Sequence, residues 1–372
     1  MNIGVDARPL VKQKVGFGYF LENMLDAILE KDNRNHYYLF SDREVVYDVS
    51  HFPNVEIVNY KDNFLCPKSF YYYYRLPAFI RKKKIRLDVF WGTMHLMPRG
   101  FEQSVKKILT VHDFTHIRFP KSTTKYNLLI SKLFFESSIQ NSNQVICISH
   151  NTENELKEYY ARACKGKEIT TVYEGGCKNK TSNAIDESNI RPEIKEIKGK
   201  RYILFVGTIE PRKNIKLLLK AAPKLKGVVQ VVICGKIGWE QKEVVEQLGR
   251  TDNLLYFNYV TQDEKLFLMK NTFCQVQPSL YEGFGLPVVE SIQAGTVVLV
   301  ANNSSLSELI EMNELKFETG CVTDFLQKVK DLVECTSLYD KAKVYCKNRG
   351  QCFQWSNAAS SYLVYFGENL NA

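Results

Sequence analysis

The chain of 372 residues lacks several features that would place it in a simple class. It has no C-x-x-C pair and no cysteines at metal-ligand spacing, which argues against a zinc or dithiol motif built on cysteines. No apolar run approaches the length of a bilayer crossing. Its composition, 45% hydrophobic and 24% charged, is typical of a folded globular chain and excludes a disordered one.

Ten cysteines are present, but they are scattered, and several fall inside apolar runs typical of buried strands, such as Cys147 and Cys234. We therefore expect reduced thiols in a core, as in cytoplasmic proteins. Residues 1–6 favour a buried strand over a signal peptide. Together these features predict a cytoplasmic chain, or a peripheral one on the inner face of the plasma membrane.

Short apolar runs alternate with helical patterns, which predicts an α/β fold with mainly parallel sheets. The length favours two domains. A polar stretch rich in Gly, Asn, Lys and Ser separates two similar halves and is typical of a linker. The expected boundaries are a first domain at 1–174, a linker at 175–200, a second domain at 201–354 and a final helical segment at 355–372. The strands expected are 3–5, 37–40, 55–58, 89–91, 107–111, 144–148, 170–172, 202–206, 229–234, 254–256, 274–277 and 297–300.

The segment 279–295, SLYEGFGLPVVESIQAG, carries the most information about function. Two glutamates lie eight residues apart, with a glycine turn and a proline that suits the first turn of a helix. Amides at a helix start favour a phosphate, and carboxylates accept hydrogen bonds from sugar hydroxyls. The pattern predicts a ligand that carries both groups, although a plain strand-to-helix turn is the structural alternative. The residues expected to contact this ligand are Glu282, Gly283, Phe284, Gly285, Leu286 and Glu290.

Three further segments follow predicted strands, where ligands of open α/β sheets bind. The first is GTIEPRKN at 207–214, in which Arg212 and Lys213 are suited to a diphosphate. The second is GFG at 16–18; it lacks the third glycine of a dinucleotide fingerprint, which argues against NAD. The third is HDFTHIRFP at 112–120, whose His112 and Asp113 are cleft candidates, although a lone histidine is usually a core residue.

These segments resemble retaining glycosyltransferases of the GT4 family. The resemblance is carried by the E-x7-E motif from Glu282 to Glu290, by GT-x-EPRKN, by HD-x4-RFP and by the glycine loop of Gly16 and Gly18. It implies the GT-B fold, in which two Rossmann-like domains face a central cleft. It also implies that the last helix, within 355–372, crosses back to the first, acceptor-side domain.

The resemblance implies roles for these residues. Glu282 would contact sugar hydroxyls, Glu290 the ribose, and Arg212 and Lys213 the leaving diphosphate, with help from the glycine loop at 16–18. His112 would contact the transferred sugar, with Asp113 beside it. No D-x-D sequence is present to hold a metal, so we expect neither a metal nor another cofactor. We also expect Glu282→Ala to abolish transfer with little loss of fold stability.

The favoured function is therefore transfer of a hexose from a nucleotide-sugar to a hydroxyl of a glycan or lipid-linked glycan. The blocks look most like mannosyltransferases of bacterial surface polysaccharide synthesis that use GDP-mannose. UDP-glucose and UDP-N-acetylglucosamine remain alternative donors. A GT-B epimerase and a non-catalytic glycan or nucleotide-sugar binder are the rival functions.

A basic and aromatic stretch at 70–86, with the runs FYYYY and RKKKIR, remains open to two interpretations. It fits a surface for anionic lipid headgroups or for a lipid-linked diphosphate. It equally fits a helix with a solvated basic end and tyrosines packed in the core. The net charge of +9 does not predict nucleic-acid binding, because no recognised nucleic-acid module is present.

Overall fold

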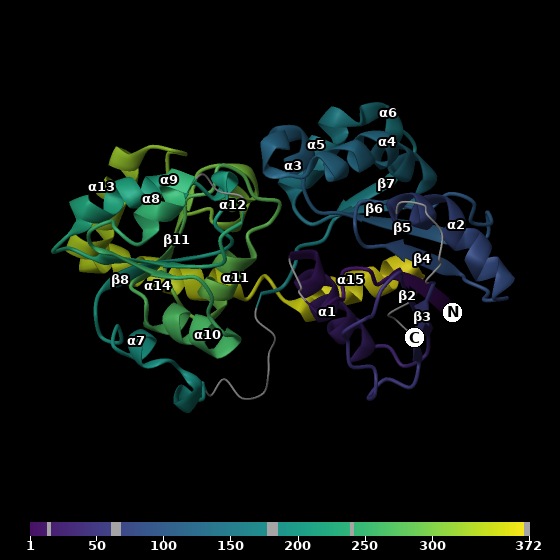
Figure 1. Cartoon of the computed structure of the whole chain (residues 1–372), viewed down its shortest axis with the longest axis horizontal. Helices are drawn as coiled ribbons and strands as arrows, with labels where there is room; N and C mark the ends of the chain where they lie inside the picture. Colours follow the sequence, from purple (N-terminus) through teal and green to yellow (C-terminus); the bar gives the residue numbers. More distant parts are fainter. Residues whose placement is uncertain (13–15, 61–67, 177–184, 239–241, 368–372) are drawn as a thin grey trace. The chain divides into compact units, whose positions relative to one another are not determined.

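The computed structural model describes residues 1–12, 16–60, 68–176, 185–238 and 242–367. The chain divides into two compact units, one made of Met1–Gly175 with Gln354–Ala372 and the other of Gly176–Phe353. Each unit is built on one parallel sheet with helices packed against it (Figure 1). Each has the doubly wound arrangement that the alternating sequence pattern predicted.

The first unit holds a seven-stranded parallel sheet in the order β3-β2-β1-β4-β5-β6-β7. The sequence order of the strands reverses at the pair β1 and β4, which register Ile3 against Val89. All seven expected strands are present, each within two residues of its expected ends. Their bounds are β1 Asn2–Asp6, β2 His36–Ser41, β3 Val55–Asn59, β4 Val89–Gly92, β5 Lys106–Val111, β6 Gln144–Cys147 and β7 Glu168–Thr171.

Helices cover both faces of this sheet (Figure 1). Alternate residues of β5 serve the two faces: Leu109 belongs to the core beneath α4, whereas the Thr110 hydroxyl lies 2.9 Å from that of Tyr362 in α15. The chain's last helix is therefore part of the first unit's core, and it also packs Tyr362 against Trp91. The helices are α1 Gly16–Leu29, α2 Lys68–Lys82, α3 Thr115–Arg118, α4 Lys125–Asn141, α5 His150–Tyr159, α6 Ala161–Cys164 and α15 Trp355–Phe366, with a 3-10 turn at Pro120–Ser122.

The second unit holds a six-stranded parallel sheet in the order β10-β9-β8-β11-β12-β13, with its reversal between β8 and β11. The strands β8, β9 and β12 are buried along nearly their whole length, which explains their nearly continuous apolar sequences. The last strand was not expected from the sequence. The bounds are β8 Tyr202–Val206, β9 Gln230–Cys234, β10 Leu254–Phe257, β11 Cys274–Gln277, β12 Val298–Ala301 and β13 Lys316–Phe317.

The second unit's helices include a long pair, α13 and α14, in a region where the sequence analysis named none. The capping box of Thr261 and Glu264 sets the start of α10. The helices are α7 Pro192–Lys195, α8 Ile215–Ala221, α9 Lys242–Leu248, α10 Gln262–Asn271, α11 Leu286–Gln293, α12 Ser304–Leu309, α13 Val322–Glu334 and α14 Thr336–Gly350, with 3-10 turns at Glu187–Asn189, Pro211–Lys213, Ala222–Leu225 and Asn313–Leu315.

The segment 175–200, expected as a linker, is packed into the second unit from residue 185 onward. Ile190, Ile194 and Ile197 are buried in one core cluster with Tyr202. Arg191 donates to Glu264 at 2.7 Å and ties the segment to α10. In the sequence, the spacing of these isoleucines, four and three residues apart, indicates a segment packed on one face. The surrounding polar residues obscured this pattern and favoured a linker. Residues 177–184 of this segment lie outside the described part of the chain.

In the ranges that the structure describes, no helix combines the length and the hydropathy needed for a bilayer crossing.

Candidate functional site

Two loops meet where the second sheet reverses its strand order. The strands β8 and β11 are neighbours and run parallel, so the segments that follow Val206 and Gln277 leave the same edge of the sheet. The Leu280 amide donates to the Arg212 carbonyl at 2.8 Å and joins the two loops directly. This edge, at the reversal point, is where open α/β sheets bind ligands.

Glu282 lies at the centre of these loops and accepts hydrogen bonds from four side chains. Its Oε1 accepts hydrogen bonds from Lys213 Nζ at 2.6 Å, Ser279 Oγ at 2.6 Å and Gln277 Nε2 at 2.9 Å. Its Oε2 accepts from Arg212 Nη1 at 2.7 Å. The glutamate that sequence analysis assigned to a sugar therefore also fixes both cations assigned to the diphosphate.

Burial and charge act in opposite directions on this cluster. Burial favours a protonated Glu282, but the charges of Lys213 and Arg212 and the hydrogen bonds outweigh it and hold the carboxyl pKa well below its usual range. Burial also lowers the pKa of the Lys213 ammonium, and the nearby Arg212 charge adds to that effect, while Glu282 partly offsets it. Glu282 is therefore a carboxylate, and the two loops depend on it electrostatically.

Arg212 is held from three directions. Besides Glu282, it donates to the Tyr281 carbonyl at 2.7 Å and to Glu210 Oε1 at 2.6 Å. The next loop residue, Asn214, adopts a left-handed backbone (φ 55°), and its side chain donates to the Pro278 carbonyl at 3.2 Å. The guanidinium thus has a fixed place at the sheet edge, which suits bidentate recognition of an oxyanion.

The glycine turn of the motif leads into α11 through Gly285, whose φ of 117° is disfavoured for other residues. The Ser305 hydroxyl donates to the Phe284 carbonyl at 2.6 Å, which fixes the turn against α12. Phe284 is 3% exposed and its ring packs edge-on against Phe353, so the ring is part of the core. The helix begins at Leu286 with proline in its first turn, as the sequence predicted.

Glu290 lies on the second turn of α11, because the helix starts four residues earlier. Lys265 of α10 donates to its Oε1 at 2.7 Å, and both side chains are less than one fifth exposed. The lysine is a site candidate that the sequence analysis missed, since α10 is distant from the motif in sequence.

The first unit places the remaining candidates around the strand reversal of its own sheet. His112 follows β5; its Nε2 donates to the Thr93 carbonyl at 2.9 Å, and its Nδ1 lies 3.6 Å from Glu174 Oε1. Phe17, from the glycine segment, contacts the His112 ring edge-on at 4.7 Å. The glycine segment and the histidine segment therefore meet, as their positions after two strands suggested.

Gly16 is the first residue of α1 and is exposed, whereas Gly18, two residues later, is buried. Asp113 accepts a hydrogen bond from the Thr115 amide through Oδ1 at 2.9 Å and so shapes the start of α3. The candidate residues thus fall into two groups. Gly16, Gly18, His112 and Asp113 lie in the first unit, and the other eight lie in the second.

His95 is a candidate that sequence reasoning missed. It follows β4, has a left-handed backbone (φ 58°) and accepts a hydrogen bond from the His112 amide through Nε2 at 2.9 Å. Burial, reinforced by the neighbouring His112, lowers the pKa of His95 to about 3. Its place directly after a strand at the sheet reversal was the available signal. The neutral ring fixes the backbone of the histidine segment.

The model of the family "Glycosyl transferases group 1" matches residues 186–349, which contain the whole Glu282 cluster. Residues 186–349 therefore belong to the group 1 glycosyltransferase family (GT4). This is a family of retaining hexosyltransferases, and the two parallel sheets match its GT-B fold.

Relatives of this chain include bacterial mannosyltransferases. The O-antigen chain mannosyltransferase B of Escherichia coli is 26% identical over 286 residues, covering 74% of this chain and 73% of that one. The serotype-specific mannosyltransferase WbdA of the same species is 30% identical over 180 residues; the match covers 46% of this chain and only 22% of WbdA. HepE from Anabaena, solved with UDP and glucose, has a TM-score of 0.67 at 15% identity over 98% of this chain and 99% of that chain.

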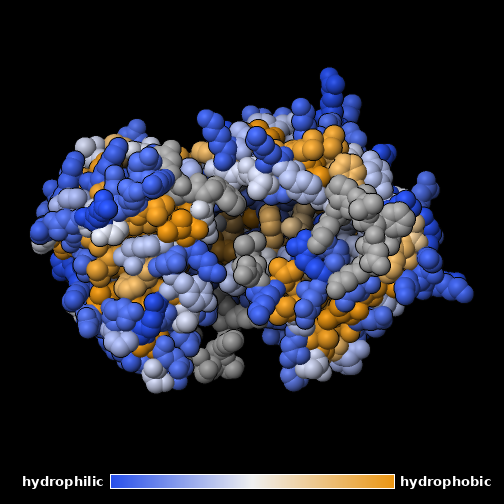
Figure 2. All heavy atoms as spheres, in the orientation of Figure 1, coloured by the Kyte–Doolittle hydropathy of each residue, from blue (hydrophilic) through white to orange (hydrophobic). Residues whose placement is uncertain are grey.

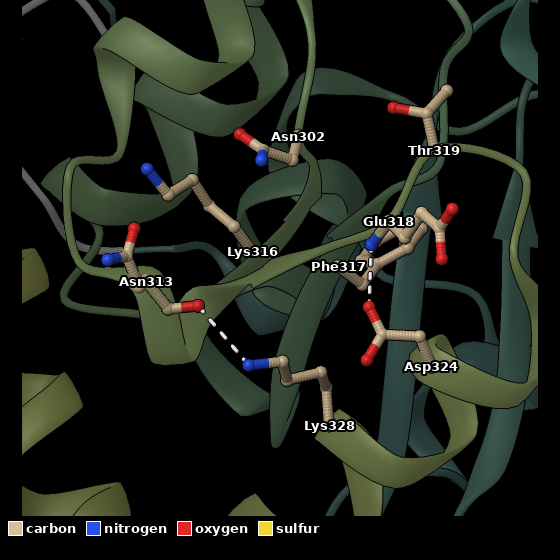
Figure 3. A pocket seen from close by; sticks show the side chains of 8 residues that line it. All are labelled: Asn302, Asn313, Lys316, Phe317, Glu318, Thr319, Asp324 and Lys328. Carbon is tan, nitrogen blue, oxygen red and sulfur yellow. Dashed lines mark hydrogen bonds between the residues drawn. The ribbon is translucent and has the colours of Figure 1, made fainter.

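A separate hollow of about 570 Å³ opens on the second unit, at β13 and the segment that follows β12 (Figure 3). Asp324 accepts from the Glu318 amide at 2.6 Å, and Lys328 donates to the Asn313 carbonyl at 3.3 Å. None of the site residues predicted from sequence lines it. Two of its charged side chains are thus bonded to backbone groups of other lining residues, and we assign it no ligand.

A pH experiment tests the role of His95. A histidine whose folded pKa lies below its unfolded value near 6.5 stabilises the fold above pH 6.5 and loses that contribution as pH falls toward about 3. His95→Gln keeps an acceptor near Nε2 but cannot titrate. We expect it to reduce the decline in unfolding free energy below pH 6.5 by up to about 1.4 kcal/mol per pH unit. Denaturant titrations at several pH values measure this.

The groups whose charges act on His95 are His112, Asp113 and His116. His150→Gln, at an exposed position of α5, is the matched control and should keep the wild-type slope. An unchanged slope in His95→Gln would show that the imidazole is not buried as described.

Proposed function

We propose that this chain transfers a hexose with retention from a nucleotide-sugar to a hydroxyl of a glycan or lipid-linked glycan, without a metal. The observation that carries the proposal is the buried cluster of Glu282, Lys213 and Arg212 at the reversal point of the second sheet. A donor at this edge would meet two cations, the backbone of a glycine turn and a carboxylate together. Those are the groups that a sugar diphosphate needs.

The hydrogen bonds that Lys213 and Glu282 already make suggest which part of the nucleotide-sugar each of them would contact. Within the described residues, Lys213 Nζ donates one of its three protons and leaves two for diphosphate oxygens. Glu282 Oε1 accepts three hydrogen bonds, whereas Oε2 accepts one and has room for a sugar hydroxyl. In the proposed reaction, the acceptor hydroxyl attacks the anomeric carbon from the face that the diphosphate leaves. A leaving diphosphate oxygen takes its proton, and Arg212 and Lys213 stabilise the charge that develops.

Mannose from GDP-mannose is the proposed donor, because relatives matched over most of the chain's length are named as O-antigen mannosyltransferases. UDP-sugars remain the alternative, since HepE was solved with UDP and glucose. Glu290 of α11, which forms an ion pair with Lys265 of α10, is the proposed contact for the ribose hydroxyls. We place the acceptor on the cytoplasmic face of the membrane, where a lipid-linked glycan and a soluble donor can meet.

Calorimetric titration tests the donor assignment. In metal-free buffer, GDP, UDP, GDP-mannose, UDP-glucose and UDP-N-acetylglucosamine are titrated in turn, and we expect selective binding of GDP and GDP-mannose. Lys213→Ala should weaken that binding about ten- to a hundredfold, the effect of losing one charge-assisted contact.

Lys226→Ala is the matched control, because Lys226 is 68% exposed and pairs with Asp252 away from these loops. It should bind as the wild type does. Absence of binding to all five compounds would contradict the proposal. Selective binding without transfer to any hydroxyl acceptor, or with epimerised nucleotide-sugar as the product, would replace it with one of the rival functions.

A further inference from the structure

The outward face of α4 exposes large apolar side chains at helical spacing. Leu129 is 51% exposed, Leu133 50% and Tyr126 45%, and the three lie three and four residues apart on one face. The opposite face of the same helix is buried in the core through Phe134, Phe135 and Ile139 among others. In Figure 2, hydrophobic residues reach the surface in the region of α4 among hydrophilic ones. Because the opposite face of α4 already packs in the core, this exposed apolar row indicates a surface for interaction.

Helix α2 lies beside α4 and adds to this surface. The Tyr126 hydroxyl donates to Ser69 Oγ at 3.0 Å, and the ring of Tyr74, 51% exposed, contacts the Phe134 ring edge-on at 5.9 Å. Tyr72 and Tyr73 are buried instead. The aromatic stretch is therefore partly core and partly exposed surface.

The charge around this surface has one sign. Residues 68–86 contain seven Lys or Arg and no Asp or Glu, and residues 115–135 contain four and none. Arg75, Lys125 and Lys132 are exposed and adjoin the apolar side chains in sequence. The first acidic residue on the face, Glu136, comes after Leu133. We call Tyr74, Tyr126, Leu129 and Leu133 with Arg75, Lys125 and Lys132 the α2–α4 face.

We propose that the α2–α4 face docks this chain on the surface of an anionic lipid bilayer. Leucines can enter the boundary between headgroups and acyl chains, while tyrosines and the long stems of lysine and arginine suit the interface itself. Basic residues near an anionic leaflet add attraction that salt screens. A protein partner would match the apolar row only in a limited area, whereas an anionic lipid surface would also attract the exposed basic residues Arg75, Lys125 and Lys132 beside that row. This inference does not depend on the proposed donor or reaction.

Vesicle co-sedimentation of the full chain tests the docking surface. We expect the wild type to bind vesicles of phosphatidylglycerol and phosphatidylcholine, to release them as salt rises, and not to bind pure phosphatidylcholine. Leu129→Glu/Leu133→Glu should weaken binding at least about tenfold, because it removes two inserted side chains and adds negative charge. Lys125→Glu/Lys132→Glu should weaken it by about fivefold or more for each charge removed.

Val344→Glu/Val364→Glu is the matched control, since both valines are exposed on other helices, at 61% and 46%. It should bind vesicles as the wild type does, and all three variants should keep the wild-type melting temperature. Equal binding by the leucine variant and the wild type would overturn the proposal. So would a wild type that ignores vesicles but forms an oligomer that the leucine variant cannot form, since the face would then be a protein interface.

Discussion

Replacing Glu282 with alanine should abolish glycosyl transfer and also lower the free energy of unfolding by about 3–5 kcal/mol. The second effect differs from the expectation drawn from sequence, which treated this glutamate as a ligand contact alone. The structure gives the reason: Lys213 and Arg212 are both buried against it, and its loss leaves two cations facing each other without their shared anion. Chemical denaturation followed by circular dichroism measures the stability, and a donor-consumption assay measures the activity.

Two further variants separate stability from chemistry. Glu282→Gln/Lys213→Met removes one charge of each sign with side chains of similar length. It should recover much of the lost stability and none of the activity. Glu290→Ala, which breaks the more exposed pair with Lys265, should cost only about 1 kcal/mol. A Glu282→Ala protein as stable as the wild type would contradict the buried cluster, and one with wild-type turnover would contradict the assignment of the site.

The acid dependence of these variants follows from the same cluster. The folded pKa of Glu282 is depressed, so its stabilising contribution is complete above the ordinary glutamate value near 4.5 and is lost as pH falls below it. The wild type should therefore lose stability below about pH 4.5 more steeply than Glu282→Gln. The His95 effect begins two pH units higher, so the two contributions can be measured apart.

Gly235→Ala should lower the free energy of unfolding by at least about 3 kcal/mol and disturb the donor loops. A Cβ on Gly235 would lie 1.8 Å from the backbone oxygen of Gly207, and its φ of 155° is rare for other residues. The two glycines follow the neighbouring strands β9 and β8, so neither backbone can move without breaking the parallel pairing there. Overpacking and backbone strain each cost about 1–3 kcal/mol.

Gly249→Ala is the matched control, because a Cβ at Gly249 would meet nothing within 4 Å. It should change stability by less than about 0.5 kcal/mol. Thermal and denaturant melts of both variants measure the difference. A Gly235→Ala protein with wild-type stability would show that the β8 and β9 loops do not approach as closely as the structure has them.

The strands were largely predictable from sequence because both faces of each sheet are covered, which forces nearly continuous apolar runs of four to six residues. The start of α11 was predictable because glycine and proline have strong local preferences. The helices α13 and α14 were not predicted, although Val322, Phe325, Val329 and Leu332 have helical spacing. The region contains no recognised motif, but this apolar spacing alone was sufficient to predict α13.

Contacts across the site could not be predicted in the same way. Lys213 and Glu282 are 69 residues apart, and their 2.6 Å contact depends on β8 and β11 being neighbours in the sheet. Sequence showed that each follows a strand, and the family resemblance implied a shared ligand. Neither the sequence nor the resemblance showed that Glu282 neutralises Lys213 and Arg212. For the same reason His95 was overlooked, since its importance lies in a hydrogen bond to a strand that is its neighbour only in the fold.

The sequence by itself determined the two α/β units, the position of nearly every strand, and the chemical groups of the site, because these depend on local apolar periodicity and on short motifs. Only the tertiary structure decided which strands are adjacent and which charges are paired. It also decided which aromatic side chains are buried in the core and which are exposed on the α2–α4 face. Those features depend on strand order and on packing between distant segments, and no local pattern in the chain encodes them.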